Sequence, residues 1–409
     1  MSFYYHGFAH RTEHIKPSAI REALKIIAQP DIISFAGGLP APELFPREDI
    51  RQICSDMLAD PVKGPGSLQY NLTEGYPPLV HYLAEELTRE GIPTSPSNII
   101  ITTGSQQSLD LLGKVFLNPD DKVVVENPTY VGALQAFNAY QAQYLTIPGD
   151  DEGMRVDQIE TILKNYRPKL IYVVSNFSNP TGITMTRYRR EVLQQLAYQY
   201  QVPIIEDDPY GETRYSGERV PSIKSIGNGQ GVILQRSFSK TFAPGFRIGY
   251  TVAPPEVINK MVAAKQSVDL QSNTFGQMVV YEYLRSGKLP AHIEKLCEVY
   301  RHRRDVMLEA MEQYFPREAH WTRPDGGLFI WATLPEGMSS LSLLQEAVAQ
   351  KVAFIPGNAF FANGGGDNTM RLNFSNASDE MLVEGVKRLG TVIKKHVNRF
   401  PTALPAFLV

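Results

Sequence analysis

The sequence predicts an α/β fold in which a mainly parallel sheet is covered by helices. Between residues 99 and 253, apolar runs rich in β-branched residues alternate with amphipathic segments of helix length. Most of these runs are continuously apolar, which is typical of strands that are buried on both faces. The chain has 409 residues, of which 43% are hydrophobic and 20% charged, as expected of a folded protein with two or three domains.

Seven runs form the strands of the predicted large sheet: Ile99–Thr102, Lys122–Glu126, Tyr144–Ile147, Leu170–Val174, Pro203–Asp207, Val232–Gln235 and Ile248–Ala253. Helices are expected between them, for example at Ser105–Leu117 and Thr186–Tyr200. In the first helix, Leu109, Leu112 and Phe116 recur on one face. Such an alternation of strands and helices indicates parallel pairing through helical crossovers.

The last third predicts a smaller α+β unit, with a long helix from about Pro290 to Tyr314. Its other expected elements are strands at Leu328–Thr333, Val352–Ile355 and Met370–Phe374 and helices at Leu341–Gln350 and Asp379–Val397. We therefore predict an N-terminal segment (1–50) that joins the small domain, a large domain (51–288) and a small C-terminal domain (289–409). No Pro-, Gly- or Ser-rich linker separates the domains, so we expect them to pack closely.

Charge and cysteine content argue against several classes of protein. Lys and Arg number 40 against 43 Asp and Glu, which leaves no basic surplus for nucleic acid or an anionic membrane. The two cysteines, Cys54 and Cys297, can form no disulfide framework and lack zinc-site spacing. No apolar run has a membrane-helix length, and the first residues lack the core of a signal peptide. We expect a cytoplasmic protein without a metal.

Polar residues follow three of the predicted strands. Gly104 permits a turn before Ser105, which begins a helix where free N–H groups favour a phosphate, although this serine could be an ordinary cap. Asn179 lies at the carboxyl end of its strand, where α/β folds bind ligands, although its Asn-Pro-Thr-Gly run could be a plain turn. Asp207 ends another strand, and a buried carboxylate there needs a partner. A protonated heteroaromatic nitrogen, Mg²⁺ and water are the three alternatives.

The strongest motif runs from residue 237 to residue 249. Lys240 stands there among small, aromatic and apolar residues, and desolvation would lower the pKa of its amine and suit Schiff-base formation. Ser237, Ser239 and Arg247 could bind a phosphate dianion. A lysine at the edge of the core is the simpler alternative. Arg371, on a late apolar strand, needs a carboxylate that is either structural or part of a substrate.

In this order and spacing, these motifs resemble the fold-type I pyridoxal-phosphate-dependent aminotransferases of classes I and II. The resemblance extends from Phe35 to about Gly390. The early run Ile33–Pro46 is similar to a narrower branch, which contains the 2-aminoadipate, kynurenine and multi-substrate aminotransferases. The same branch contains the aminotransferase-like domains of MocR-type regulators.

The resemblance implies a pyridoxal 5′-phosphate cofactor, held as an aldimine on Lys240. Asp207 would pair with the ring nitrogen, Asn179 and Tyr210 would contact the 3′-oxygen, and Tyr130 would stack on the ring. Lys240, Asp207 and Tyr210 would thus be the catalytic residues. The residues implied to bind the phosphate are Ser105, Gln106, Ser237, Ser239 and Arg247.

Other implied residues concern the substrate and a second subunit. Arg371, together with Asn179 and Gly38, would bind the amino-acid substrate and its α-carboxylate. Arg21 would stand at the mouth of the site, where it meets a distal carboxylate or withdraws for an apolar side chain; it could equally be a solvated helix residue. Tyr70 would reach the phosphate of the neighbouring subunit in a homodimer.

These implications predict a transaminase with ping-pong kinetics. It would move the amino group of 2-aminoadipate, glutamate, or an aromatic or branched-chain amino acid to a 2-oxo acid such as 2-oxoglutarate. One alternative is a non-enzymatic effector-binding module of MocR type, but the residues before Phe35 leave little room for its DNA-binding domain. Another is a lyase, decarboxylase or racemase, because these enzymes share the motifs that hold the cofactor.

Overall fold

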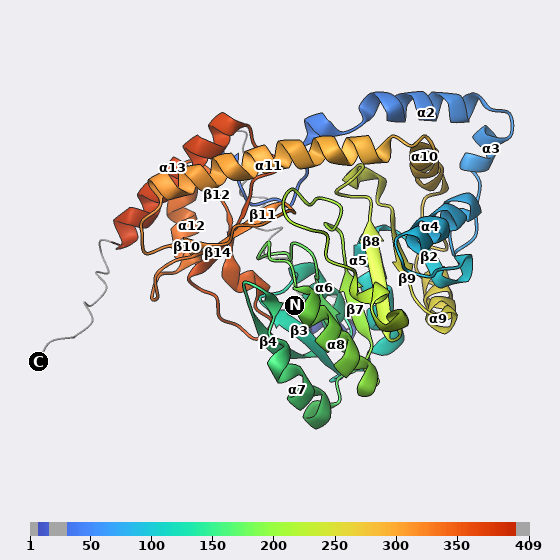
Figure 1. The fold of residues 1–409 in the computed structure, drawn as a ribbon, viewed down its shortest axis with the longest axis horizontal. Coiled ribbons are helices and arrows are strands. Elements are labelled where there is room, and N and C mark those ends of the chain that lie inside the picture. Colours follow the sequence, from blue (N-terminus) through green and yellow to red (C-terminus); the bar gives the residue numbers. More distant parts are fainter. Residues whose placement is uncertain (1–6, 16–30, 398–409) are drawn as a thin grey trace, which may run out of the picture.

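The computed structural model describes residues 7–15 and 31–397 and contains a large sheet of eight strands (Figure 1). In spatial order the strands are β2 (Ile99–Thr102), β9 (Gly249–Val252), β8 (Val232–Ser237), β7 (Ile204–Asp207), β6 (Leu170–Val173), β3 (Lys122–Asn127), β4 (Gln143–Asp150) and β5 (Gly153–Met154). Strands β8, β7, β6, β3 and β4 are parallel to one another. Strand β9 is antiparallel to both of its neighbours, and β5 is antiparallel to β4.

Helices cover both faces of this sheet, which explains why its strands read as continuous apolar runs. In β3, Val123 and Val125 belong to the same core cluster as α5 (Gly104–Phe116) and α6 (Val131–Asn138). Val124 belongs to the opposite cluster. That second cluster contains α7 (Ile159–Tyr166) and α8 (Arg187–Gln199). The fold class expected from the sequence is confirmed.

The remaining helices around the large sheet are α2 (Arg47–Ala59), α3 (Lys63–Ser67), α4 (Pro77–Arg89), α9 (Pro255–Gln266) and α10 (Thr274–Arg285). Apolar residues of α4 and α10 form a core cluster with β2 and β9 at one edge of the sheet. No helix in residues 7–15 and 31–397 combines the length and the apolar character that crossing a membrane requires.

A four-stranded antiparallel sheet forms a second layer, in the order β10 (His320–Trp321), β11 (Phe329–Thr333), β14 (Thr369–Asn373) and β13 (Ile355–Pro356). It lies with α11 (Leu289–Tyr314), α12 (Ser340–Ala349) and α13 (Asp379–Val397). The long helix α11 runs from the vicinity of α10 to α13, which packs against it (Figure 1).

One expected strand was wrong in detail. The run Val352–Ile355 forms two short strands with different partners, not one. Strand β12 (Val352–Ala353) pairs in parallel with β1 (Ile33–Ser34), whereas β13 pairs with β14. The chain therefore changes neighbours at Phe354, whose side chain is fully buried. The domain limits at residues 50 and 288 stay predictions.

Candidate active site

Four distant segments meet beyond the carboxyl ends of the parallel strands. The Lys240 ammonium donates a hydrogen bond to the Gly38 carbonyl oxygen at 2.7 Å. Arg371, from β14, donates from Nη1 to Asn179 Oδ1 at 2.8 Å and from Nη2 to the Ala36 carbonyl at 2.7 Å. These contacts join the N-terminal segment, the loop after β6, the loop after β8 and the small sheet in one site.

Asp207 ends β7 with an incompletely satisfied carboxylate. The residue is 2% exposed, and its Oδ2 accepts a 2.8 Å hydrogen bond from the Tyr172 hydroxyl on β6. Its Oδ1 is buried and has no hydrogen-bond partner among the described residues. Burial raises the pKa of Asp207 to about 6, against the opposing effects of the neighbouring Gln235 side chain and of the Tyr172 hydrogen bond. A buried acceptor without a partner is costly, so this oxygen suits a positively charged N–H group.

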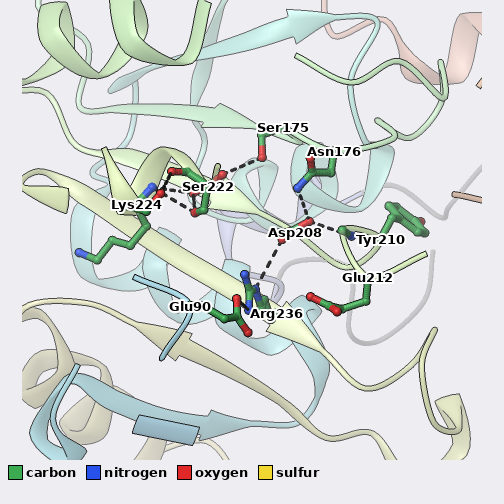
Figure 2. A network of polar contacts seen from close by, with 12 residues as sticks. Glu90, Ser175, Asn176, Asp208, Tyr210, Glu212, Ser222, Lys224 and Arg236 are labelled. Atoms are coloured by element: carbon green, nitrogen blue, oxygen red, sulfur yellow. Dashed lines mark hydrogen bonds and ion pairs between the residues drawn. The ribbon is translucent and has the colours of Figure 1, made fainter. Parts of the chain in front are cut away.

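The other two acids of this strand end are already satisfied. Glu206 accepts hydrogen bonds from the Ser175 and Ser222 hydroxyls and from two backbone N–H groups. Asp208 accepts from Asn176 Nδ2 at 2.9 Å and lies 3.5 Å from Arg236 Nε (Figure 2). Only Asp207 among the three therefore has a free carboxylate oxygen, which disfavours a magnesium site built from this cluster.

Lys240 lies in surroundings that favour a neutral amine. Removal from water, followed by the positive charges of Arg371 and Arg247, lowers the pKa of its ammonium group to about 8. At such a pKa the amine exchanges protons readily near neutral pH. The amine is held in place by the Gly38 carbonyl, two residues along the chain from the Ala36 carbonyl that Arg371 contacts.

An anion cradle lies at the N-terminus of α5. Gly104 has a φ of +71°, a conformation that favours glycine, and a Cβ atom at this position would displace the Arg247 guanidinium. Arg247 Nη1 lies 3.4 Å from the Ser239 hydroxyl, which accepts a 2.9 Å hydrogen bond from Ser237. Ser105 stands in the first turn of α5, where helix N–H groups are free. The arrangement suits a phosphate.

Arg371 is a buried cation that lacks an ion-pair partner within the described part of the chain. It is 2% exposed, and its guanidinium lies over the rings of Phe329 and Phe360, at 4.2 and 5.1 Å from their centroids. Burial lowers its pKa to about 10, and its Nε has no hydrogen bond to any described residue. Such a group binds a carboxylate strongly, because the ion pair relieves its desolvation.

The other residues predicted for the site are Tyr210, Tyr130, Gln106, Tyr70 and Arg21. Tyr210 is buried and packs edge-on against Phe329. Tyr130 precedes α6, and its hydroxyl lies 3.4 Å from Oε1 of Gln106, whose amide in turn donates to the Gly132 carbonyl. Tyr70 is 78% exposed and turned to solvent. Arg21 lies outside the described residues.

The comparisons agree with this geometry. Residues 57–389 match the family described as aminotransferase class I and II. The chain belongs to this family. It is 48% identical to an aromatic-amino-acid aminotransferase of Thermococcus litoralis, over 96% of this chain and 95% of that one. Its fold and family make the chain an aminotransferase of fold type I.

Two solved structures are similar over nearly the whole chain. A multiple-substrate aminotransferase of Thermococcus profundus is 46% identical, with a TM-score of 0.93, and covers 97% of this chain and 100% of its own. The α-aminoadipate aminotransferase LysN of Thermus thermophilus, complexed with N-(5′-phosphopyridoxyl)-L-leucine, is 40% identical with a TM-score of 0.91, over 98% of this chain and 100% of its own.

Sequence reasoning missed Tyr172, because nothing in an apolar strand shows where its one hydroxyl points. We predict that Tyr172→Phe weakens the binding of pyridoxal phosphate, the cofactor expected from the sequence, by roughly tenfold at pH 7. Without the hydroxyl the pKa of Asp207 rises further, so the carboxylate becomes protonated, and affinity falls, at a higher pH than in the parent.

The measurement is the dissociation constant of the cofactor from the apoenzyme between pH 5 and 8. Tyr198→Phe, at an exposed tyrosine on α8, is the matched control. A Tyr172→Phe profile that coincides with the Tyr198→Phe profile contradicts the role of this hydrogen bond.

Proposed function

We propose that this aminotransferase moves the amino group of 2-aminoadipate, glutamate, or an aromatic or branched-chain amino acid to 2-oxoglutarate or a similar 2-oxo acid. The observation that carries the proposal is one site with two buried, unpaired groups of opposite charge, Asp207 and Arg371. The pKa of the Lys240 amine is lowered to about 8 by burial and by the charges of Arg371 and Arg247. The names of the T. litoralis and T. thermophilus relatives support the range of donors.

The cofactor is pyridoxal phosphate, and the charges of the site fit it group by group. The free Asp207 oxygen suits the protonated ring nitrogen, Tyr130 the ring face, and Asn179 and Tyr210 the 3′-oxygen. Residues proposed to hold the phosphate are Ser105, Gln106, Ser237, Ser239 and Arg247. Once the amino-acid substrate has displaced Lys240 from it, the cofactor would supply the electron sink for the pair that is left when the substrate Cα loses its proton.

The chain's own groups then have separate tasks. Arg371, oriented by Asn179 and the Ala36 carbonyl, binds the substrate α-carboxylate. Lys240, released from the cofactor by the substrate, would take the proton from the substrate Cα and deliver it to C4′ of the cofactor, which a pKa of about 8 allows near neutral pH. Asp207 must stay ionised to keep its cationic partner charged. Residues 51–288 would supply Asp207 and Lys240, and 289–409 would supply Arg371.

A homodimer is the assembly that we propose. Val62, Leu68, Tyr70 and Leu72 are each more than half exposed, as is Leu270. A hydrogen bond between the Asn71 N–H and the Gln271 side chain joins these two segments, so the apolar side chains form one surface. Apolar patches of this kind mark protein interfaces, and Tyr70 on this patch would reach the partner's phosphate.

Free Cys54 and Cys297 support a cytoplasmic location.

The proposed dimer interface can be tested by placing a negative charge among its exposed apolar side chains. Leu68→Asp should shift the protein to monomers at micromolar concentration in sedimentation velocity, since a buried carboxylate at an interface costs several kcal/mol. Leu341→Asp, at a leucine on α12 that is 53% exposed, should leave the assembly unchanged. Equal behaviour of the two variants would contradict the proposed interface.

The function is tested through Lys240→Ala. We expect transamination to fall by at least ~10³-fold, because both the covalent link and the base are lost. Cofactor should remain bound without being fixed by borohydride. Exposed Lys260→Ala is the control. For every donor except glutamate, activity is measured as the 2-oxo acid and glutamate formed in equal amounts from the donor and 2-oxoglutarate; glutamate is tested with a different 2-oxo acid as acceptor. Ammonia or carbon dioxide without glutamate would indicate a lyase or decarboxylase instead.

A further inference from the structure

A cavity of about 360 Å³ lies outside the active site, between the β4–β5 edge of the large sheet and the small sheet. Lys240, Asp207, Tyr210 and Arg371 do not line it. One wall is formed by Ser178 and Thr181, from the loop that also carries Asn179 on its other side. Small-molecule sites in proteins have volumes of this order.

Both tryptophans of the chain line this cavity, although they lie on different strands of the small sheet. Trp321, on β10, packs edge-on against Phe315, and Trp331, on β11, packs edge-on against Phe360. These contacts fix the orientation of both rings. The indole Nε1 of Trp321 is buried without a hydrogen-bond partner in the described chain. Indole faces attract cations, most strongly where water is excluded.

The opposite wall is acidic. Glu126, at the end of β3, is 6% exposed, and its one hydrogen bond to a described residue is a 3.3 Å contact from the Val174 N–H. No described lysine or arginine forms an ion pair with it, and burial raises its pKa to about 8. Asp150 and Asp151 stand at the rim, where Asp150 is paired with Arg189.

Above about pH 8, where Glu126 is ionised, the charge of this cavity is opposite to that of the catalytic site. Among the described residues, its lining contains no lysine or arginine and one histidine, His320, whereas Arg371, Arg247 and Lys240 belong to the catalytic site. At that pH a ligand with a carboxylate or phosphate would therefore be repelled by Glu126 and Asp151. A positively charged ligand would contact both a carboxylate and two aromatic rings. Its charge would lower the pKa of Glu126 and so favour the ionised form of this residue.

We propose that the cavity is a second small-molecule site that binds an organic cation of the alkylammonium type, with its charged nitrogen between Glu126 and the indoles of Trp321 and Trp331. The site would recognise charge and shape together, since the aromatic walls bind the alkyl groups and the carboxylate binds the charge. The proposal does not depend on which amino acid the enzyme transaminates.

Choline is the probe of choice, because its quaternary nitrogen cannot react with the cofactor's carbonyl carbon. The holoenzyme is titrated above pH 8, where Glu126 is ionised, and binding is followed by tryptophan fluorescence and calorimetry. Both tryptophans lie in the cavity, so the fluorescence change reports on this place. We expect saturable binding of choline and at least tenfold weaker binding of 3,3-dimethylbutan-1-ol, its uncharged isostere.

Two variants locate the binding. Glu126→Gln keeps the volume of the side chain and should weaken choline about tenfold, whereas Glu256→Gln, at an exposed position on α9, should not. Trp321→Leu, at a partly exposed ring, should also weaken the binding of choline. This variant tests the site if Glu126→Gln does not fold.

Several results would overturn the proposal. They are no saturation by ~50 mM choline, equal affinity for choline and its isostere, and butyrate binding tighter than choline. Unchanged choline affinity in both folded variants would do the same.

Discussion

The free oxygen of Asp207 is the constraint on which the rest of the site depends. The carboxyl is buried at the end of a central strand, where an unpaired acceptor costs several kcal/mol. One hydrogen bond from Tyr172 compensates part of that cost and fixes the carboxyl's orientation. The other oxygen is left for a cation, and neighbouring Glu206 and Asp208 cannot compete for it because other donors occupy them. The fold thus keeps a single negative charge open at this place.

Each positively charged group of the site suits a different part of the ligands. The Arg247 cradle suits a phosphate and Arg371 suits a carboxylate, while burial and these two arginines lower the pKa of Lys240 to about 8. Each group lacks the partner that a purely structural residue would have in the described chain. A ligand that carries a phosphate, a ring cation and a carboxylate satisfies all of them together. This is why the geometry favours cofactor and amino acid in one site.

Much of this site could be predicted from the sequence, because strand ends and short motifs fix it locally. Asp207 ends an apolar strand, and Lys240 is the one charged residue between Ser237 and Phe246, so burial and its effect on chemistry could be read from the residues alone. The fold class followed in the same way from continuous apolar runs. The division of Val352–Ile355 into two strands could not be predicted, because it depends on which neighbour each half pairs with.

Contacts between residues far apart in the sequence could not be predicted either, because they also depend on which elements become neighbours in the fold. Tyr172 meets Asp207 only because β6 and β7 pair in one particular register, with Tyr172 beside Ile205. The Arg371 contact with the Ala36 carbonyl joins the two ends of the chain. The cavity beside Glu126 depends on both sheets. In each case the residue types were visible, but their juxtaposition is a property of the folded chain.

The role that we propose for Asp207 is to keep a positive charge on the cofactor ring. The most direct measurement compares Asp207→Asn loaded with pyridoxal phosphate and with its N-methyl derivative, whose ring charge is permanent. We expect kcat to fall by at least ~100-fold with the ordinary cofactor and to recover by at least ~10-fold with the methylated one. An Asp207→Asn enzyme with the parent's kcat, or one that the permanent charge does not restore, would contradict this role of Asp207.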